Sequence, residues 1–397
     1  MCGKDYGIND LCELNSSVGD SYYLYYSNEI RNNYNLVANS FCSKYANTIV
    51  AYAYKPNYLP NICKTIYQMG GYAEISSELE YRIAKKCGVD DRHIIYNGPY
   101  TEDNVLKQLV IGGGIINIDS MEEAKKVLSI AHSLKMKTNI GIRCLISTTK
   151  KRFSKFGFVP YTNEFEDIVQ LAIQDAYLSL VVLHCHVKGR TLEDWEQRTK
   201  EMIKIAQYID KKYGIKIWAI DLGGGLPVPD SGLMELYSDT VCTLFNQEYK
   251  NSTCKPYLIL EPGTAIAATA MSYVTKVINV KKRMDKNIVF LGGTASSIKA
   301  LGKSYEIPIE IMSIKKQEIC GLNDFSGITC MEDDYFSFGY EGSIGVGDYI
   351  IFHNVGAYSF VMKPPFVLGT PAIISWPDKR IVKRKETSDD MIRMFQF

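Results

Sequence analysis

Several features that mark common protein classes are missing from this sequence. Its 11 cysteines form no C-x-x-C pair and are scattered along the chain, which argues against a disulfide framework or a zinc site and for reduced thiols. Neither charge sign dominates, because 45 Lys and Arg residues stand against 44 Asp and Glu residues. We therefore expect no nucleic-acid partner, no anionic membrane partner and no bound metal.

Signals for membrane insertion or export are also missing. No apolar run reaches the roughly 20 residues that are needed to cross a bilayer. The first residues, MCGKDYGINDLCELNSS, have neither the basic start nor the apolar stretch of a signal peptide. These absences predict a cytoplasmic protein whose partners are small molecules or a second copy of the same chain.

What the sequence does contain predicts an α/β protein. From about residue 48, short apolar runs alternate with amphipathic stretches at helical spacing, a pattern typical of parallel βα units. Eight such units predict a closed (β/α)8 TIM barrel. The eight runs are TIVAYAYK, GYAEIS, HIIYNG, GIINIDS, TNIGIRCL, LVVLHCHV, IWAIDLGGG and YLILEPG.

The remainder of the chain predicts a second domain. After about residue 268, β-branched and aromatic runs such as YVTKVINVKK, KNIVFLGG and PAIISW are separated by turns, without a strong helical period. The early run SYYLYYS adds a strand to it. We therefore predict a barrel over residues 28–268 and an all-β domain formed by residues 1–27 and 269–397.

Four unusual features each close an apolar run of the predicted barrel: Lys55, His186, the glycines Gly223 to Gly225, and Glu261. Strand ends meet at the C-terminal face of such a barrel, where reactive groups lie. One His or Glu at a strand end is more often a satisfied structural group. Four features on one face favour a functional site.

The motifs YAYKPN, LHCHVKG, DLGGG, EPGT and GDYIIFHNVGAYSF occur in this order. Together they resemble those of the fold-type III decarboxylases that use pyridoxal 5'-phosphate (PLP), the group of diaminopimelate and ornithine decarboxylases. That resemblance implies an alanine-racemase-like barrel with PLP bound as a Schiff base to Lys55. A lysine amine held dry at a strand end has a lowered pKa and reacts readily with an aldehyde.

The resemblance also implies further cofactor contacts. His186 would stack on the pyridine ring, Glu261 would face the ring nitrogen, and the Tyr358 hydroxyl would lie near the phosphate. Gly223, Gly224 and Gly225 would let backbone N–H groups approach phosphate oxygens. Arg143 is a further cofactor-binding candidate. It is more simply explained, together with Glu74, Ser77 and Asp119, as one of several residues that orient one another inside the barrel.

Two departures from the family pattern affect anion binding. Lys188 and Gly189 stand where the family has Gly and Ser, so a phosphate-binding hydroxyl is missing, and Lys188 or Arg190 is a candidate replacement. Thr264 stands where the family has the arginine of its E-P-G-R motif.

The resemblance further implies a homodimer with shared active sites. Cys330, in CMEDD, would protonate the carbanion left after carbon dioxide departs, and would be contributed by the second subunit. Asp334 would pair across the interface with Lys155, in the S-K-F-G loop.

Other departures bear on the amino-acid substrate. Met331 follows the catalytic cysteine where the diaminopimelate and ornithine enzymes have an acidic residue, and a thioether cannot neutralise an ammonium group. Lys299 stands in place of a substrate-clamping arginine. We therefore expect lysine, ornithine and diaminopimelate to be poor substrates, and a larger carboxylate-bearing amino acid to be preferred, as in siderophore and other secondary pathways.

Two alternatives remain open at this stage. A PLP-dependent racemase passes through the same carbanion, although the racemase motif around the lysine is absent and the decarboxylase cysteine is present. A catalytically silent relative that binds a partner protein is the second alternative, and the presence of Lys55, Glu261 and Cys330 argues against it.

Overall fold

The computed structural model describes residues 5–146, 154–299, 307–314 and 320–396. It divides into two compact units, one formed by Arg31–Ile266 and the other by Met1–Ile30 together with Ala267–Phe397. We describe each unit by itself.

The first unit is a closed barrel of eight parallel strands, in the order in which they follow one another along the chain. The barrel closes where the first strand pairs with the last. This confirms the predicted (β/α)8 fold. The strands are β2 (Thr48–Ala53), β3 (Tyr72–Ile75), β4 (Ile94–Tyr96), β5 (Ile115–Ile118), β6 (Thr138–Arg143), β7 (Leu178–His184), β8 (Ala219–Asp221) and β9 (Tyr257–Leu260).

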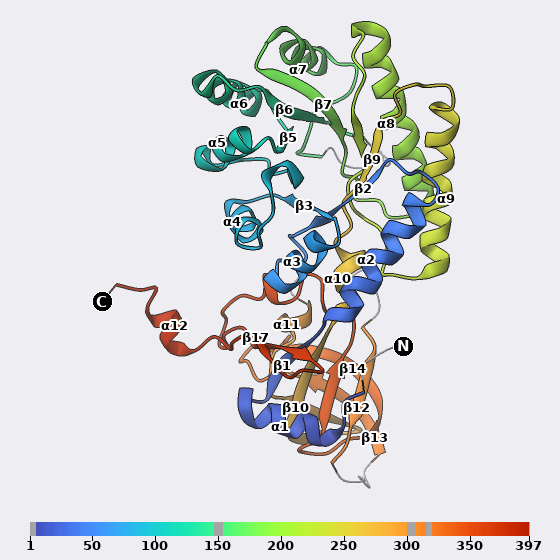
Figure 1. Cartoon of the computed structure of the whole chain (residues 1–397). Coiled ribbons are helices and arrows are strands. Elements are labelled where there is room, and N and C mark those ends of the chain that lie inside the picture. Colours follow the sequence, from blue (N-terminus) through green and yellow to red (C-terminus); the bar gives the residue numbers. More distant parts are fainter. Residues whose placement is uncertain (1–4, 147–153, 300–306, 315–319, 397) are drawn as a thin grey trace. The chain divides into compact units, whose positions relative to one another are not determined.

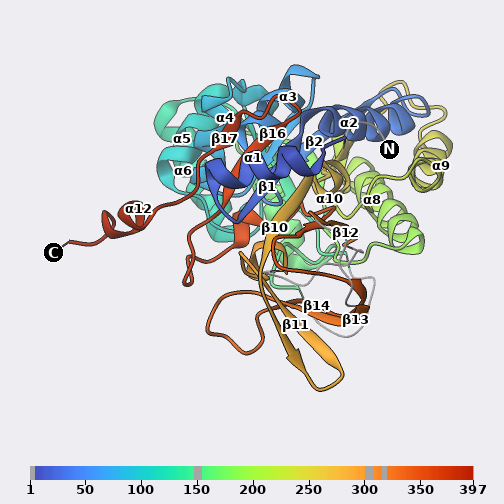
Figure 2. The ribbon, with the colours of Figure 1, turned by 90° about the horizontal axis from the view of Figure 1, so that it is seen from below.

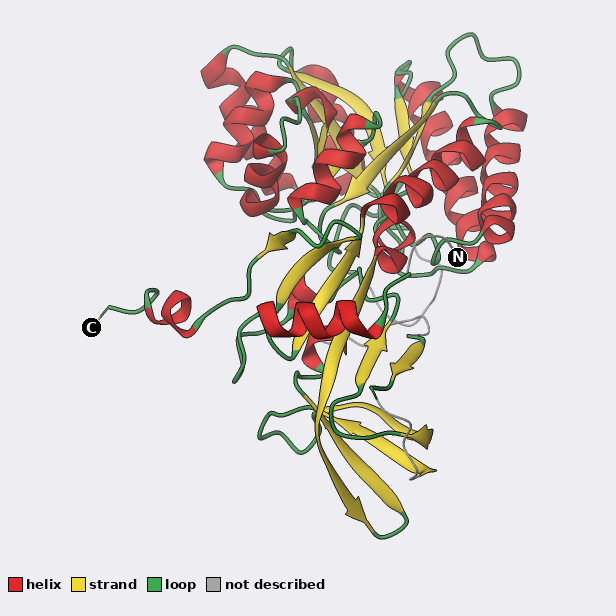
Figure 3. Ribbon diagram, turned by 60° about the horizontal axis from the view of Figure 1, so that its bottom comes forward, coloured by secondary structure: helices red, strands yellow, loops and turns green. Residues whose placement is uncertain are grey.

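Helices surround these strands (Figures 1 and 3). Several begin at side-chain caps that their sequences predict: Ser120 accepts a hydrogen bond from Glu123 N, and Thr191 forms a capping box with Asp194. The helices are α2 (Ser27–Cys42), α3 (Pro60–Gln68), α4 (Glu78–Lys86), α5 (Asp103–Gly112), α6 (Met121–Leu134), α7 (Asn163–Gln174), α8 (Leu192–Tyr213), α9 (Ser231–Glu248), and the short α10 (Thr264–Ala267) and η1 (Asp91–His93).

Apolar and polar side chains occupy different levels of the barrel interior. Ala51, Ile95, Ile115, Val182, Ala219 and Ile259 form a buried apolar cluster. Polar side chains are buried at or just after the C-terminal ends of the same strands. The apolar layer fills the barrel in the usual way, so the polar residues are confined to one end of it.

The second unit is built on a nine-stranded sheet, in the order β14-β13-β11-β10-β1-β16-β17, with β15 pairing with both β10 and β12. The strands are β1 (Ser21–Tyr26), β10 (Met271–Arg283), β11 (Lys286–Leu291), β12 (Ile309–Met312), β13 (Cys320–Ser326), β14 (Tyr335–Ser343), β15 (Tyr349–Phe352), β16 (Ala372–Trp376) and β17 (Ile381–Lys383). Residues 21–26 add a strand, as their sequence predicts, between β10 and β16 (Figure 2).

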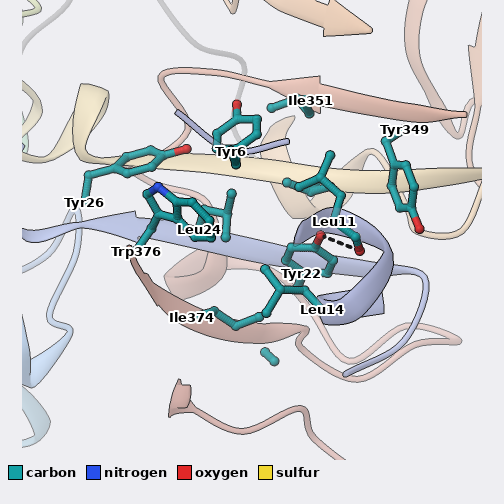
Figure 4. Close-up of a cluster of buried hydrophobic side chains, with 12 residues drawn as sticks. Tyr6, Leu11, Leu14, Tyr22, Leu24, Tyr26, Tyr349, Ile351, Ile374 and Trp376 are labelled. Atoms are coloured by element: carbon teal, nitrogen blue, oxygen red, sulfur yellow. Dashed lines mark hydrogen bonds between the residues drawn. The ribbon is translucent and has the colours of Figure 1, made fainter. Parts of the chain in front are cut away.

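The prediction that this unit is all-β needs a correction, because it also contains α1 (Ile8–Val18), α11 (Ser296–Lys299), α12 (Ser388–Ile392) and the short η2 (Ala268–Ala270) and η3 (Phe360–Met362). α1 buries Leu11 and Leu14 in an apolar cluster with Tyr22, Leu24 and Trp376 (Figure 4). No helix within the described residues is long and apolar enough to cross a membrane.

The α1 cluster provides a first test of this fold. Leu24 is fully buried in the cluster, so Leu24→Ala is expected to lower the free energy of unfolding by about 2–5 kcal/mol, through lost burial and the cavity that remains. Met284, whose side chain is 96% exposed, supplies the control. Chemical denaturation monitored by circular dichroism measures both variants. Equal stability of Leu24→Ala and Met284→Ala would contradict the packing of this cluster.

Candidate active site

Polar side chains converge at the C-terminal end of the barrel. Glu74 is the third residue of β3, Asn97 directly follows β4, and Glu261 directly follows β9. All three are buried, with exposed fractions of 0%, 7% and 1%. Buried polar groups require partners, and these side chains find them in one another.

Lys55, just beyond β2, lies beside Glu74. Its Nζ is 2.5 Å from Glu74 Oε2, and the backbone N–H of Tyr54 donates to the carbonyl of Glu74. Burial raises the pKa of Glu74 to about 7, against the opposing effect of Lys55. The lysine amine therefore shares a proton with a carboxyl group that titrates near neutral pH.

Glu261 lies between two histidines. Its Oε1 is 3.6 Å from His184 Nε2, and its Oε2 is 3.6 Å from His186 Nδ1. Burial opposes ionisation of Glu261, but the two histidines and Lys55 outweigh burial and hold its pKa well below the usual range. Burial also lowers the pKa of His184 to about 4, so this ring is neutral near pH 7. The carboxylate thus carries the charge of this cluster.

Asp221 is a third buried acid at the end of β8. Burial, and then the charge of Glu261, raise its pKa well above the usual range. Its Oδ1 accepts a hydrogen bond from Gly223 N at 2.8 Å. Burial therefore opposes ionisation of Asp221, and its hydrogen bond shapes the turn that begins the glycine loop.

The glycine loop requires its glycines. Gly223 and Gly225 have φ angles of +70° and +101°, a region that side-chain-bearing residues rarely adopt. A Cβ atom on Gly223 would lie 2.3 Å from the carbonyl oxygen of Cys185, and one on Gly224 would lie 2.8 Å from that of Glu261. The loop therefore leaves its backbone close to the site with no side chains in the way.

Arg198, on α8, holds this loop in place. Its Nη1 donates to the carbonyls of Leu222 and Gly224 at 3.1 and 2.9 Å, and its Nη2 donates to that of Gly189. The guanidinium also packs over the ring of Trp195, 4.2 Å from the ring centroid. Our sequence predictions did not include Arg198, because nothing in an amphipathic helix distinguishes an inward arginine from an exposed one.

The remaining sequence candidates of this unit lie around the same strand ends. Arg143 Nη1 is 3.2 Å from Asp119 Oδ1 and packs over the ring of Phe156. Lys155 is exposed, with its Nζ 5.0 Å from the centroid of the same ring.

Ser77 caps α4 by accepting from Glu80 N. Lys188 and Arg190 are exposed, Gly189 accepts from Arg198, and Thr264 is buried at the start of α10.

These residues fit pyridoxal 5'-phosphate. Among the described residues, Glu261 Oε2 and both ring nitrogens of His184 are buried without a hydrogen-bond partner. A carboxylate with one oxygen that accepts no hydrogen bond suits the protonated nitrogen of a pyridine ring. A glycine loop without side chains suits the close approach of a phosphate, although the N–H groups of Gly223 and Gly224 already donate to Asp221 and His186. Lys55 would supply the amine that binds the aldehyde, and His186 a flat ring beside the pyridine.

Comparison with known proteins agrees with this fit. Residues 28–268, more than half of the chain, match the family model of the pyridoxal-dependent decarboxylases, which describes their pyridoxal-binding domain. The chain belongs to the pyridoxal-dependent decarboxylases. It is therefore a PLP-dependent carboxy-lyase of fold type III that acts on an amino acid.

Several similar members of this decarboxylase family are diaminopimelate decarboxylases. The chain is 27% identical to diaminopimelate decarboxylase of Methanocaldococcus jannaschii over 96% of this chain and 92% of that one. It is 24% identical to diaminopimelate decarboxylase of Aquifex aeolicus, over 96% and 93%. The crystal structure of the M. jannaschii enzyme superimposes with a TM-score of 0.87 at 25% identity, over 96% and 93% of the two chains.

These relatives contradict our expectation that diaminopimelate is a poor substrate of this decarboxylase. That prediction relied on Met331 and Lys299 and is wrong. Met331 is 54% exposed on a loop whose next two residues, Glu332 and Asp333, are also exposed. The loop therefore carries acidic groups despite the thioether. The side chain of Lys299, which ends α11, lies outside the described part of the chain.

The other candidates of the second unit have local partners. Cys330 is exposed. Asp334 is buried, and its carboxylate accepts from Thr294 Oγ1, Ala295 N and Thr329 Oγ1 at 3.0, 2.8 and 2.6 Å. Asp334 therefore fixes the loop that carries Cys330, a role that we did not predict. Tyr358 is partly buried, with a φ of 53°.

The arginine beneath the glycine loop provides a test of this site. Arg198→Met leaves the three loop carbonyls without their donor, so it is expected to weaken PLP binding about tenfold or more and to destabilise the cofactor-free protein by about 3 kcal/mol. Arg82→Met, on the exposed face of α4, is the matched control. Fluorescence titration with PLP and thermal unfolding measure the two effects. Unchanged affinity in Arg198→Met would show that the loop does not depend on this arginine.

Proposed function

We propose that this enzyme decarboxylates diaminopimelate, removing one of its two carboxylates as carbon dioxide and leaving lysine. Relatives named for this activity, similar over nearly the whole of both chains, support the choice of substrate. The observation that carries the chemistry is the pairing, at one end of the barrel, of the Lys55 amine with the buried Glu74 and of the buried Glu261 with two histidines.

Each residue of the barrel has a distinct task in this proposal. Lys55 would hold the cofactor through its amine, and Glu74, whose pKa is raised to about 7, would accept and return the proton of that amine. Bound PLP supplies the electron sink into which the departing carboxylate leaves its electrons. Glu261, ionised and buried, keeps the ring nitrogen protonated, and His186 restrains the ring.

The exposed loop around Cys330 completes the proposed site from a second copy of the chain. The Cys330 thiol would return a proton to the reacting carbon, and Glu332 and Asp333 would face the distal ammonium of the substrate. Asp334 holds this loop through buried hydrogen bonds, and Tyr358 would contact the phosphate. We propose a homodimer in which each active site combines residues of both subunits, and a cytoplasmic location.

Replacement of the lysine tests the chemistry. Lys55→Ala is expected to abolish carbon dioxide release from diaminopimelate, because no amine remains to bind the cofactor covalently. Borohydride reduction and peptide mass spectrometry should label Lys55 in the wild type, while the exposed Lys155 stays unlabelled. Lysine and ornithine serve as comparison substrates. Faster turnover of either one than of diaminopimelate would contradict the proposed specificity, and a labelled lysine elsewhere would contradict the assignment of Lys55.

Mixing two inactive variants tests the shared site. Lys55→Ala and Cys330→Ala are each expected to have little activity, whereas a mixture regains activity, because one site of a mixed dimer receives both native residues. Cys254→Ala removes another exposed cysteine and should leave activity unchanged. Mass spectrometry under native conditions verifies that mixed dimers form. Mixed dimers without recovered activity would place Lys55 and Cys330 of one site in the same subunit.

A further inference from the structure

A continuous chain of hydrogen bonds links the amine of Lys55 to the carboxylate of Glu261. Lys55 Nζ contacts Glu74 Oε2 at 2.5 Å, and Glu74 Oε1 accepts from Asn97 Nδ2 at 3.0 Å. The same Asn97 nitrogen also donates to Glu261 Oε1. A single amide group therefore bridges the carboxylate beside the lysine and the carboxylate assigned to the pyridine nitrogen.

The orientation of the Asn97 amide is fixed by its third partner. Asn117, 1% exposed on β5, donates from Nδ2 to Asn97 Oδ1 at 2.7 Å. Because the Asn97 oxygen is held by this donor, both N–H groups of its amide point to the two carboxylates. All hydrogen-bonding groups of the Asn97 side chain are thus in use.

Gly141 on β6 makes room for this arrangement. A Cβ atom at position 141 would lie 1.8 Å from Asn117 Oδ1, which is closer than any nonbonded contact permits. The backbone of β6 must therefore come close to Asn117, and the sequence meets this need with glycine in the middle of a strand, where it weakens the sheet.

The charges around the bridge make its two donors important. Two buried carboxylates repel each other strongly in a medium of low dielectric constant. An amide that donates to both stabilises their ionised forms together, without adding a charge. The titratable or charged groups that face or influence these two carboxylates are Lys55 after β2, Glu80 on α4, Arg143 on β6, His184 and His186 at and after the end of β7, and Asp221 on β8.

We propose that Asn97 is a positioning residue that couples the ionisation of Glu74, and through it of Lys55, to that of Glu261. This inference rests on the roles proposed above for Lys55 and Glu261. Asn97 donates to both carboxylates, and we infer that it acts through them. Without its donors, Glu261 would hold its charge less well and would protonate at a higher pH.

Replacement of Asn97 should therefore give a pH-dependent loss of cofactor affinity. In Asn97→Leu the pKa of Glu261 should rise, because burial favours the protonated carboxyl group and the amide donor that stabilised the ionised form is gone. Above the raised pKa, Glu261 is ionised in both proteins and the PLP dissociation constants should be similar. Below it, the ratio of variant to wild-type dissociation constants should grow about tenfold per pH unit, since the variant alone loses the charge that pairs with the ring nitrogen. Measurements from pH 9 to pH 5.5 give this ratio.

Three further variants sharpen the experiment. Asn97→Asp keeps the size of the side chain but replaces the double donor with a third carboxylate, so the ratio should begin to rise at a higher pH than in Asn97→Leu. Asn117→Leu frees the amide of Asn97 and should shift the ratio in the same direction by a smaller amount. Asn139→Leu is the control, since Asn139, near the start of β6, donates to Gly113 instead. Thermal unfolding of each cofactor-free variant verifies its fold.

The outcomes separate this inference from the proposed function. The coupling is supported if the ratio rises as the pH falls. The pH at which the rise begins should be highest for Asn97→Asp, lower for Asn97→Leu and lowest for Asn117→Leu. A ratio that is constant across the pH range, even if it is large, would mean that Asn97 only fills space, and would overturn the coupling while leaving the function intact. If the wild-type protein shows no absorbance from PLP attached to Lys55, both the coupling and the proposed function are overturned.

Discussion

The site depends on three carboxyl groups buried together at one end of a barrel. Water is excluded there, so a charge persists only where donors or cations offset the cost of its burial. Glu261 lies near two histidines and accepts a hydrogen bond from Asn97, Glu74 has Lys55 and Asn97, and Asp221 accepts a hydrogen bond from the backbone N–H of Gly223. The pKa values of the three acids consequently shift differently: that of Glu261 is held well below its usual range, that of Glu74 is raised to about 7, and that of Asp221 is raised. The same type of group thus ionises with different ease at three positions of one fold.

The barrel supports this arrangement with positions that carry no chemistry themselves. Arg198 fixes the carbonyls of the glycine loop from a helix outside the strands, and Gly141 allows Asn117 to reach Asn97. In the other unit, Asp334 holds the loop of Cys330 through its buried hydrogen bonds. Such residues keep reactive groups in place, and a small displacement of those groups would be costly for catalysis.

Much of the fold was predictable because it depends on local pattern. All eight barrel runs became strands, since β-branched and apolar segments between amphipathic stretches have few alternatives. Lys55, His186 and Glu261 were recognisable as candidates because they interrupt apolar runs at strand ends. The strands β12, β13, β14 and β17 and the helix α1 were missed, because segments of mixed polar and apolar residues carry little periodic signal. The substrate inference relied on two single positions, Met331 and Lys299, and the diaminopimelate decarboxylases among the relatives contradict it.

The sequence by itself determined the architecture and the cofactor class, because strand periodicity and ordered motifs are properties of neighbouring residues. Only the tertiary structure decided which side chains share protons. Asn97, Asn117 and Arg198 look like ordinary polar residues in the sequence. Their partners lie 9 to 164 positions away along the chain, and folding of the barrel brings them within hydrogen-bonding distance. Hydrogen-bond geometry and low dielectric then set the protonation of the site, and neither exists before the chain has folded.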